Sequence, residues 1–192
     1  NEKVTCIDDF NDFYSPKAKE NNIKSILKNR NFKLYNASIT DFSKLRDAFN
    51  KNNVEKIVHL AARAGVRPSF QNPQLYEETN VRGTLNLLEL AKEFKVKNFV
   101  FTSSSSVYGR NEVPFSEDMP TDNQISVYAA TKKCAEILCR AYNNSYNTNI
   151  SILRLFTVYG PRGRPDMAPY KFTQRVFNGE EIEVYGDISS KR

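Results

Sequence analysis

The sequence has 192 residues and a net charge of +6, with 40% hydrophobic and 26% charged residues. These are ordinary values for a globular chain that is long enough to bury a core. No apolar run approaches the about 18 residues of a membrane span, and the first residues form no signal-peptide segment. We therefore expect no association with a membrane.

Histidine occurs once, at His59, which excludes a zinc site built from several histidines. We expect this side chain in the core. The three cysteines form no C-x-x-C pair, and their odd number favours reduced, buried thiols in the cytoplasm. No run reaches five like charges, so the basic balance predicts a solvated surface rather than a nucleic-acid-binding face. We expect neither a metal ion nor a nucleic acid as a partner.

Strand-like and helix-like patterns alternate along the chain. In order, they predict a strand at 4–7, a helix at 16–29, a strand at 32–36, a helix that opens at 40–43, a strand at 57–60, a helix at 73–94, a strand at 99–102, a helix at 124–146, a strand at 150–155, a helix at 168–178 and a strand at 182–185. This alternation is typical of an α/β fold with a doubly wound parallel sheet and helices on both faces.

Ligands of such a sheet bind at the carboxyl ends of its strands. Asp8 ends the first strand, where a carboxylate can accept both hydroxyls of a ribose, although a cap or turn carboxylate is the alternative. Four serines at 103–106 follow the strand at 99–102 and offer hydroxyls and backbone amides at the same edge. A flexible loop is the alternative for the serines, which the apolar residues on both sides disfavour.

Tyr128 and Lys132 form a Tyr-x-x-x-Lys pattern within the helix predicted at 124–146. Residues four apart share a helix face. An ammonium beside a phenol favours the phenolate, which a base needs because the pKa of a free phenol is about 10. Alone, the pattern is also typical of an exposed amphipathic helix.

Together and in this order, these elements resemble the extended short-chain dehydrogenase/reductases, the NAD-dependent sugar epimerase/dehydratase family. The resemblance covers essentially all 192 residues, and the segments 11–14, 59–67 and 154–168 are similar to UDP-glucuronate 4-epimerases of that family. It implies a Rossmann-type NAD-binding domain at 1–160 and the beginning of a substrate-binding domain at 161–192. It also implies NAD as cofactor and a UDP-sugar as substrate.

The resemblance implies roles for single residues. Tyr128 is the expected base, Lys132 supports it and holds the nicotinamide ribose, and Ser104 bonds the reacting sugar oxygen. Asp8 takes the adenosine ribose. The further implied contacts are Leu60, Ala61 and Ala62 beside the cofactor, Asn80 supporting the strand ends, Ser103 on the nicotinamide side, Ser105, Ser106, Thr157 and Arg164 around a sugar carboxylate, and Arg192 at the UDP phosphates.

Three departures from the family pattern matter. Ser38 stands where relatives carry an Asp that bonds adenine, which weakens that contact. Thr157 replaces the Asn of galactose-type epimerases and favours the uronate branch. None of the seven glycines forms Gly-x-x-Gly-x-x-Gly. We therefore expect the sheet to lack its first βα unit, with its phosphate-binding turn, and the chain to fold marginally.

The resemblance implies 4-epimerisation of a UDP-sugar, from UDP-glucuronate to UDP-galacturonate, through a 4-keto intermediate. A dehydratase or a decarboxylase of this family carries a carboxylate in the serine segment, which 104–106 lack. A hexosaminuronate epimerase stays open, and so does an inactive nucleotide-binding fragment. Relatives pair through the helices that hold Asn80 and Tyr128, so a homodimer is expected. The alternative for Arg164 is an ion pair with Asp166.

Overall fold

The computed structural model describes residues 2–184 of the chain. Within them strands and helices alternate, and all paired strands are parallel, which confirms the predicted α/β class. In chain order the elements are β1 (Val4–Asp8), α1 (Pro16–Ile23), β2 (Phe32–Asn36), α2 (Phe42–Asn50), β3 (Lys56–His59), α3 (Val66–Gln71), α4 (Pro73–Glu77), α5 (Gly83–Glu93), β4 (Asn98–Ser104), α6 (Val127–Ser145), β5 (Asn149–Leu155) and α7 (Ala168–Phe177).

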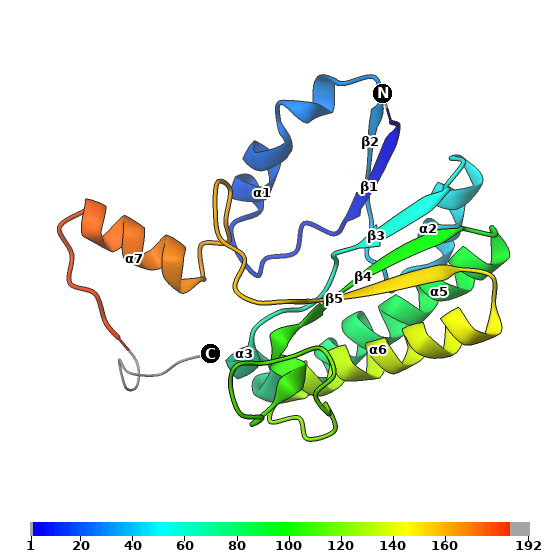
Figure 1. Ribbon diagram of the computed structural model, residues 1–192. Helices are drawn as coiled ribbons and strands as arrows, with labels where there is room; N and C mark the ends of the chain where they lie inside the picture. Colours follow the sequence, from blue (N-terminus) through cyan, green and yellow to red (C-terminus); the bar gives the residue numbers. More distant parts are fainter. Residues whose placement is uncertain (1, 185–192) are drawn as a thin grey trace.

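The strands form two separate sheets, one of order β1-β2 and one of order β3-β4-β5 (Figure 1). The doubly wound order of a Rossmann sheet is 3-2-1-4-5-6. The two sheets match the outer parts of that order, and no strand of residues 2–184 lies between β1 and β3. The expectation of a sheet without its first βα unit is therefore confirmed.

The core lies on one face of the β3-β4-β5 sheet, beneath which α5 and α6 run (Figure 1). Strand residues alternate between two faces, so Phe99 and Phe101 point into this core and are fully buried. The apolar side of α2 packs against the same cluster. The buried members of the core are Ile39, Leu45, Phe49, Ile57, Leu87, Leu88, Leu90, Ala91, Val96, Phe99, Phe101, Ala135 and Cys139.

The other face of this sheet is open. Val58 and Leu60 of the β3 region are 63% and 68% exposed. The prediction of a fully buried strand at 57–60 is therefore wrong. The reason is that α1 and α7 contain no buried residue and lie away from this sheet (Figure 1).

Most predicted elements occur within a few residues of their expected positions, and three differ. The helix predicted at 16–29 ends at Ile23, because none of its residues packs into a core that would extend it; a short 3₁₀ turn, Ile26–Lys28, follows. The helix predicted at 73–94 is interrupted by a π-helical segment, Glu78–Arg82. Residues 182–184 form no strand, and 185 lies outside the described residues.

The cysteines are free thiols that differ in exposure. Cys139 is buried, Cys6 is partly buried and Cys134 is exposed. The prediction of buried thiols is wrong for Cys134, because five residues along a helix turn it by about 140° away from the face of Cys139. Among residues 2–184, no helix has the length and apolar composition needed to cross a membrane.

Candidate active site

Helix α6 carries Tyr128 and Lys132 on one side. It begins at Val127 because the Ser126 hydroxyl accepts a hydrogen bond from the Ala129 backbone N–H at 3.1 Å. Lys132 is 3% exposed, and its Nζ lies 4.5 Å from the centre of the Phe101 ring. Burial lowers the pKa of Lys132 to about 8. Within the described residues, no carboxylate forms a salt bridge with this ammonium.

Tyr128 is partly buried and its ring is held from the side. The Tyr76 ring meets it edge-on, with 6.4 Å between ring centres, and the Tyr76 hydroxyl is fixed by donating to Ala64 O at 2.6 Å. The backbone oxygen of Tyr128 accepts from the Thr131 hydroxyl at 2.9 Å. Tyr128, with this ring contact on one side, lies one helical turn from the buried ammonium of Lys132.

Asn80 joins this helix to the loop after β3. It is 1% exposed and lies in the π-helical segment, which places its amide inward. Its Oδ1 accepts from the Arg63 backbone N–H at 2.8 Å, and its Nδ2 donates to Arg63 O and to the Thr131 hydroxyl, each at 3.0 Å. Asn80 therefore fixes the carboxyl end of β3 relative to α6.

His59 is a core residue, as expected. Burial lowers its pKa to about 3, so the ring is neutral. Its Nε2 donates to the Thr84 hydroxyl at 2.9 Å, since that hydroxyl itself donates to Asn80 O at 2.6 Å. Its Nδ1 is buried and has no hydrogen-bond partner among the described residues.

The serine segment is ordered rather than a flexible loop. Ser103, Ser104 and Ser105 are at most 9% exposed. The Ser104 hydroxyl accepts from the Ser106 backbone N–H at 3.2 Å and caps the 3₁₀ turn Ser105–Tyr108. Gly109 closes the segment with φ +62°, and a Cβ there would lie 2.1 Å from Asn123 O, so only glycine fits.

Ser103 points to the helix side of β4. Its hydroxyl donates to Glu136 Oε1 at 2.6 Å, and Glu136 is 0% exposed. Arg154 of β5 donates to both oxygens of the same carboxylate, at 3.0 Å each. Burial alone would raise the pKa of Glu136, but the hydrogen bonds from Arg154 and Ser103 outweigh it and hold that pKa below its ordinary value.

The sequence reasoning did not single out Glu136 or its contact with Arg154. A signal was present, because Arg154 is a charged residue inside the apolar run of β5 and charged side chains are rarely buried unless they are paired. Glu136 follows Lys132 by one helical turn, which puts it on the same side of α6.

Asp8 lies where the sequence predicts, at the end of β1, and is exposed. Its Oδ1 accepts from the Phe10 backbone N–H at 2.8 Å, which is the turn contact given above as the alternative. Its second oxygen has no hydrogen bond to the described residues. One oxygen of the Asp8 carboxylate therefore remains free to accept a hydrogen bond.

Arg164 forms the ion pair that was the alternative to a sugar contact. Its Nε and Nη2 donate to the two oxygens of Asp166, at 3.0 and 2.6 Å. The guanidinium lies 5.3 Å from the centre of the Phe13 ring. The hydrogen bonds to Asp166 hold the pKa of Arg164 above its ordinary value.

The remaining candidates follow the carboxyl ends of neighbouring strands. Leu60, Ala61 and Ala62 come after β3, the serines end β4, and Thr157 comes after β5. The β3-β4-β5 pairing brings these three strand ends to one edge. Thr157 is exposed, Ala61, Ala62 and Ser106 are partly buried, and Arg192 lies outside the described residues.

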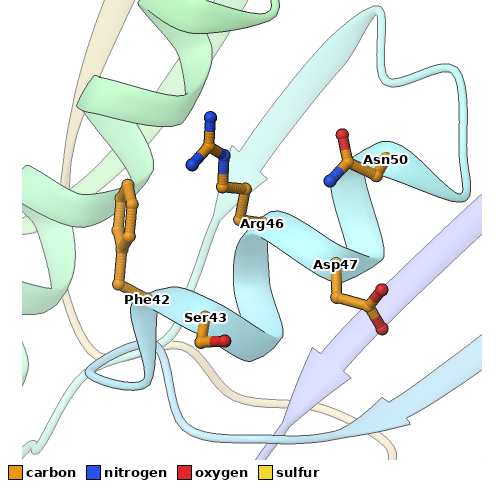
Figure 2. A pocket seen from close by; sticks show the side chains of 5 residues that line it. All are labelled: Phe42, Ser43, Arg46, Asp47 and Asn50. Carbon is orange, nitrogen blue, oxygen red and sulfur yellow. The ribbon is translucent and has the colours of Figure 1, made fainter.

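A hollow of about 560 Å³ lies elsewhere, along the outer side of α2 (Figure 2). Its lining residues are Phe42, Ser43, Arg46, Asp47 and Asn50. Arg46 pairs with Glu93 of α5 at 2.7 Å, which ties the two helices together. None of the candidate residues lines this hollow, so it contributes nothing to the site.

The fold and the site define an α/β nucleotide-binding enzyme scaffold, and comparisons with known proteins identify the family. The model of the NAD dependent epimerase/dehydratase family matches residues 1–192. The chain is 44% identical over 189 residues to the UDP-glucuronate 4-epimerase of Thermodesulfobacterium geofontis, covering 98% of this chain and 58% of that protein. It is 44% identical over 184 residues to UDP-glucuronate 4-epimerase 1 of Arabidopsis thaliana, covering 95% of this chain and 43% of that protein.

Solved structures agree. UDP-glucuronic acid 4-epimerase from Bacillus cereus, in complex with UDP-glucuronic acid and NAD, matches with a TM-score of 0.86 and 37% identity, over 96% of this chain and 58% of that one. The dTDP-glucose 4,6-dehydratase DesIV from Streptomyces venezuelae matches with a TM-score of 0.86 and 27% identity, over 97% of this chain and 56% of that one. The chain therefore belongs to the NAD dependent epimerase/dehydratase family, and it spans 43% to 58% of the length of these relatives.

Proposed function

We propose that the protein containing this chain is a UDP-sugar 4-epimerase that converts UDP-glucuronate to UDP-galacturonate with NAD. The observation that carries the proposal is the buried ammonium of Lys132, without a carboxylate partner in the described residues, one turn from Tyr128. The serines of β4 end at the same edge of the sheet. Two relatives that are each 44% identical to this chain are named as UDP-glucuronate 4-epimerases.

The residues present fit the ribose parts of NAD. Asp8 keeps a free carboxylate oxygen for a ribose diol, and Lys132 offers an unpaired ammonium for the nicotinamide ribose. Arg63 Nε is buried without a hydrogen-bond partner among the described residues, so it offers a donor to an anion. The glycine-rich turn that holds the pyrophosphate in this fold is not part of this sequence. NAD, when bound, accepts a hydride from C4 of the sugar and returns it.

Tyr128 acts as the base in this proposal. Its phenolate removes the proton of the sugar 4-hydroxyl, and the phenol gives that proton back after the 4-keto sugar has turned over. Lys132 supports the phenolate by its positive charge. Ser104 hydrogen-bonds the same sugar oxygen. Because the hydride returns to the opposite face of C4, the reaction inverts that carbon without net oxidation.

The uronate substrate asks more of the site than a neutral sugar does. Oxidation at C4 makes a β-keto acid, which tends to lose carbon dioxide, so the carboxylate must be held in place. Ser105, Ser106 and Thr157 supply hydroxyls, and Arg164 can hold a carboxylate with two parallel hydrogen bonds. Since Asp166 occupies both of those donors in this structure, the substrate carboxylate has to replace it.

We also propose that the protein is a cytoplasmic homodimer that pairs through α6 and the helix containing Asn80. Support comes from the outer side of α6, where Ile137 is 53% exposed. Sedimentation of the purified protein tests this part, and a monomer at micromolar concentration would contradict it.

The test of the function uses the protein expressed from its complete reading frame. It is incubated with UDP-glucuronate, a UDP-hexosaminuronate, UDP-glucose and dTDP-glucose, and the products are identified by NMR. We expect UDP-galacturonate from UDP-glucuronate as the fastest reaction, and no turnover by Tyr128→Phe, which keeps its UDP affinity. A 4-keto-6-deoxy product, or turnover of the hexosaminuronate alone, would contradict the proposal.

A further inference from the structure

A largely buried ion pair lies behind the proposed site, on the helix side of the sheet. Glu136 is 0% exposed, and the Arg154 side chain that grips both its oxygens is 10% exposed. Removing two charges from water costs about as much as their attraction returns, so such pairs are weak stabilisers of a fold. The position of this pair therefore calls for an explanation other than stability.

The carboxylate determines the direction of neighbouring serines. Ser103 donates to Glu136 Oε1 at 2.6 Å, which holds Ser103 on the helix side of β4. Successive side chains of a strand point to opposite faces, so Ser104 must then point away from the helices. There its hydroxyl caps the following 3₁₀ turn. The hydrogen bond that Ser103 donates to Glu136 thus also orients Ser104.

The same carboxylate connects the elements that carry the other candidate residues. Through its backbone it belongs to α6, one turn after Lys132. Through Arg154 it holds β5, which leads to Thr157. The Arg154 guanidinium also lies 5.0 Å from the centre of the Tyr108 ring and donates to Glu117 O at 3.1 Å, so the loop after the serine segment is held as well.

We propose that Glu136 is a positioning residue that sets Ser104 relative to Tyr128 and Lys132 by holding Ser103 and Arg154. This inference rests on the proposed function, because it assigns those three residues to one reaction. Glu136 itself touches neither the sugar nor the cofactor.

A second effect of Glu136 provides a readout that a purely structural role would not change. Burial lowers the pKa of Lys132, while the negative charges of Cys139, when ionised, and of Glu136 raise it. The other titratable groups near Lys132 are Tyr128, one helical turn away, and His59 of β3, which is neutral. Without the Glu136 charge, Lys132 therefore loses its proton at a lower pH. Because the ammonium of Lys132 supports the base, the alkaline limb of the kcat–pH profile should move to lower pH.

The test compares Glu136→Gln with the parent protein from the complete reading frame. In either orientation the amide presents an N–H to one nitrogen of Arg154, so one of the two hydrogen bonds that hold Arg154 is lost. We expect kcat to fall by about 100-fold, the cost of a misplacement near 1 Å, with KM within about twofold. Arg140→Gln is the matched control, because Arg140 lies 3.9 Å from Glu136 and its side chain is 57% exposed; it should retain the parent kcat.

Ser103→Ala separates geometry from charge. This variant removes the hydrogen bond between Ser103 and Glu136 but keeps the Glu136 carboxylate. It should therefore lower kcat without moving the alkaline limb of the kcat–pH profile, whereas Glu136→Gln should lower kcat and also move that limb. If Glu136→Gln does not fold, Ser103→Ala decides. The proposal is overturned if Glu136→Gln keeps the parent kcat, or if Glu136→Gln does not fold and Ser103→Ala keeps the parent kcat. It is also overturned if Glu136→Gln loses rate while the alkaline limb of its kcat–pH profile stays where it is in the parent.

Failure of the proposed function is distinguishable from failure of this inference. All rates are ratios to the parent on whichever UDP-sugar the parent converts, so a different substrate would overturn only the proposed substrate. If the parent protein converts none of these UDP-sugars, the two proteins are compared instead by the titration of the Lys132 ammonium, which NMR follows. A lower titration midpoint in Glu136→Gln than in the parent supports the inference, and an equal midpoint overturns it.

Discussion

Lys132 is the single residue whose surroundings constrain the chemistry most. Replacing it by Met keeps much of its volume but removes the buried charge beside Tyr128. We expect kcat to fall on the order of 100-fold at neutral pH and the activity to require a higher pH, since a phenolate without a neighbouring cation forms less readily. A kcat–pH profile measures both effects.

Lys133→Met is the control for this change. Lys133 is the next residue along α6, so it points elsewhere, and it contacts the Thr121 hydroxyl and Asp122 instead. A Lys132→Met protein with the parent profile, or the same loss in Lys133→Met, would remove Lys132 from the proposed mechanism.

Arg164 is the residue on which the uronate assignment depends. Arg164→Ala removes the guanidinium that is expected to exchange Asp166 for the sugar carboxylate. We expect slower epimerisation of UDP-glucuronate and the appearance of a UDP-pentose, because the β-keto acid is no longer held against loss of carbon dioxide. Product analysis by NMR measures both. The full uronate rate with no pentose would refute the role of Arg164 and weaken the case for a uronate substrate.

The sequence located the candidate residues better than it described their contacts. Asp8 lies at a strand end and Lys132 lies one turn from Tyr128, since these positions follow from local periodicity alone. The ion pair of Arg164 with Asp166 was one of two alternatives, because both partners lie in one loop. The contact of Glu136 with Ser103 was missed, since it joins residues 33 positions apart that only the packed fold brings together.

At the scale of elements, the π-helical segment around Asn80 is the connection between β3 and α6. Asn80→Ala leaves the Arg63 backbone N–H without its acceptor and removes two donated hydrogen bonds. We expect the free energy of unfolding to fall by about 2–4 kcal/mol, since an unsatisfied buried group costs about 1–3 kcal/mol and each lost bond adds to it. Urea denaturation measures this.

Asn144→Ala is the matched control for Asn80→Ala, because Asn144 lies in α6 and is exposed. It should change stability by less than about 0.5 kcal/mol. An Asn80→Ala protein as stable as this control would show that the segment does not depend on the Asn80 hydrogen bonds.

Helices and strands were predictable where a local signal specifies them. The helix predicted to open at 40–43 is confirmed by α2, where the Asp41 side chain is the cap and Leu45, Ala48 and Phe49 form the buried stripe. The apolar spacing of Ile23, Ile26 and Leu27 predicted a helix over 16–29, but none of these residues is buried, so the helix is shorter than predicted. The expected strand at 182–185 has no counterpart over 182–184, since a short apolar run becomes a strand only when a neighbour pairs with it.

At the scale of the molecule, the divided sheet was predictable but its open face was not. The missing glycine pattern indicated that the central βα unit is not part of this sequence, and the separate β1-β2 and β3-β4-β5 sheets agree. Coverage of a face depends on where helices far along the chain pack, and the periodicity of α7 does not reveal that. Val58, Leu60 and Leu153 are exposed as a result.

These exposed side chains predict how the 192-residue polypeptide behaves in isolation. Exposed apolar patches bind hydrophobic dyes, and a core with one open face unfolds at low denaturant concentration. We expect strong 8-anilinonaphthalene-1-sulfonate fluorescence and a broad thermal transition. A sharp transition without dye binding would mean that the open face is covered in solution.

In the proposed reaction, the protein inverts C4 of UDP-glucuronate by removing and returning the same hydride. UDP-glucuronate carrying deuterium at C4 tests it most directly, with the protein from the complete reading frame in ordinary water. We expect UDP-galacturonate that retains deuterium at C4, and no product from Tyr128→Phe. Loss of the deuterium to water, or no UDP-galacturonate from the parent protein, would contradict it.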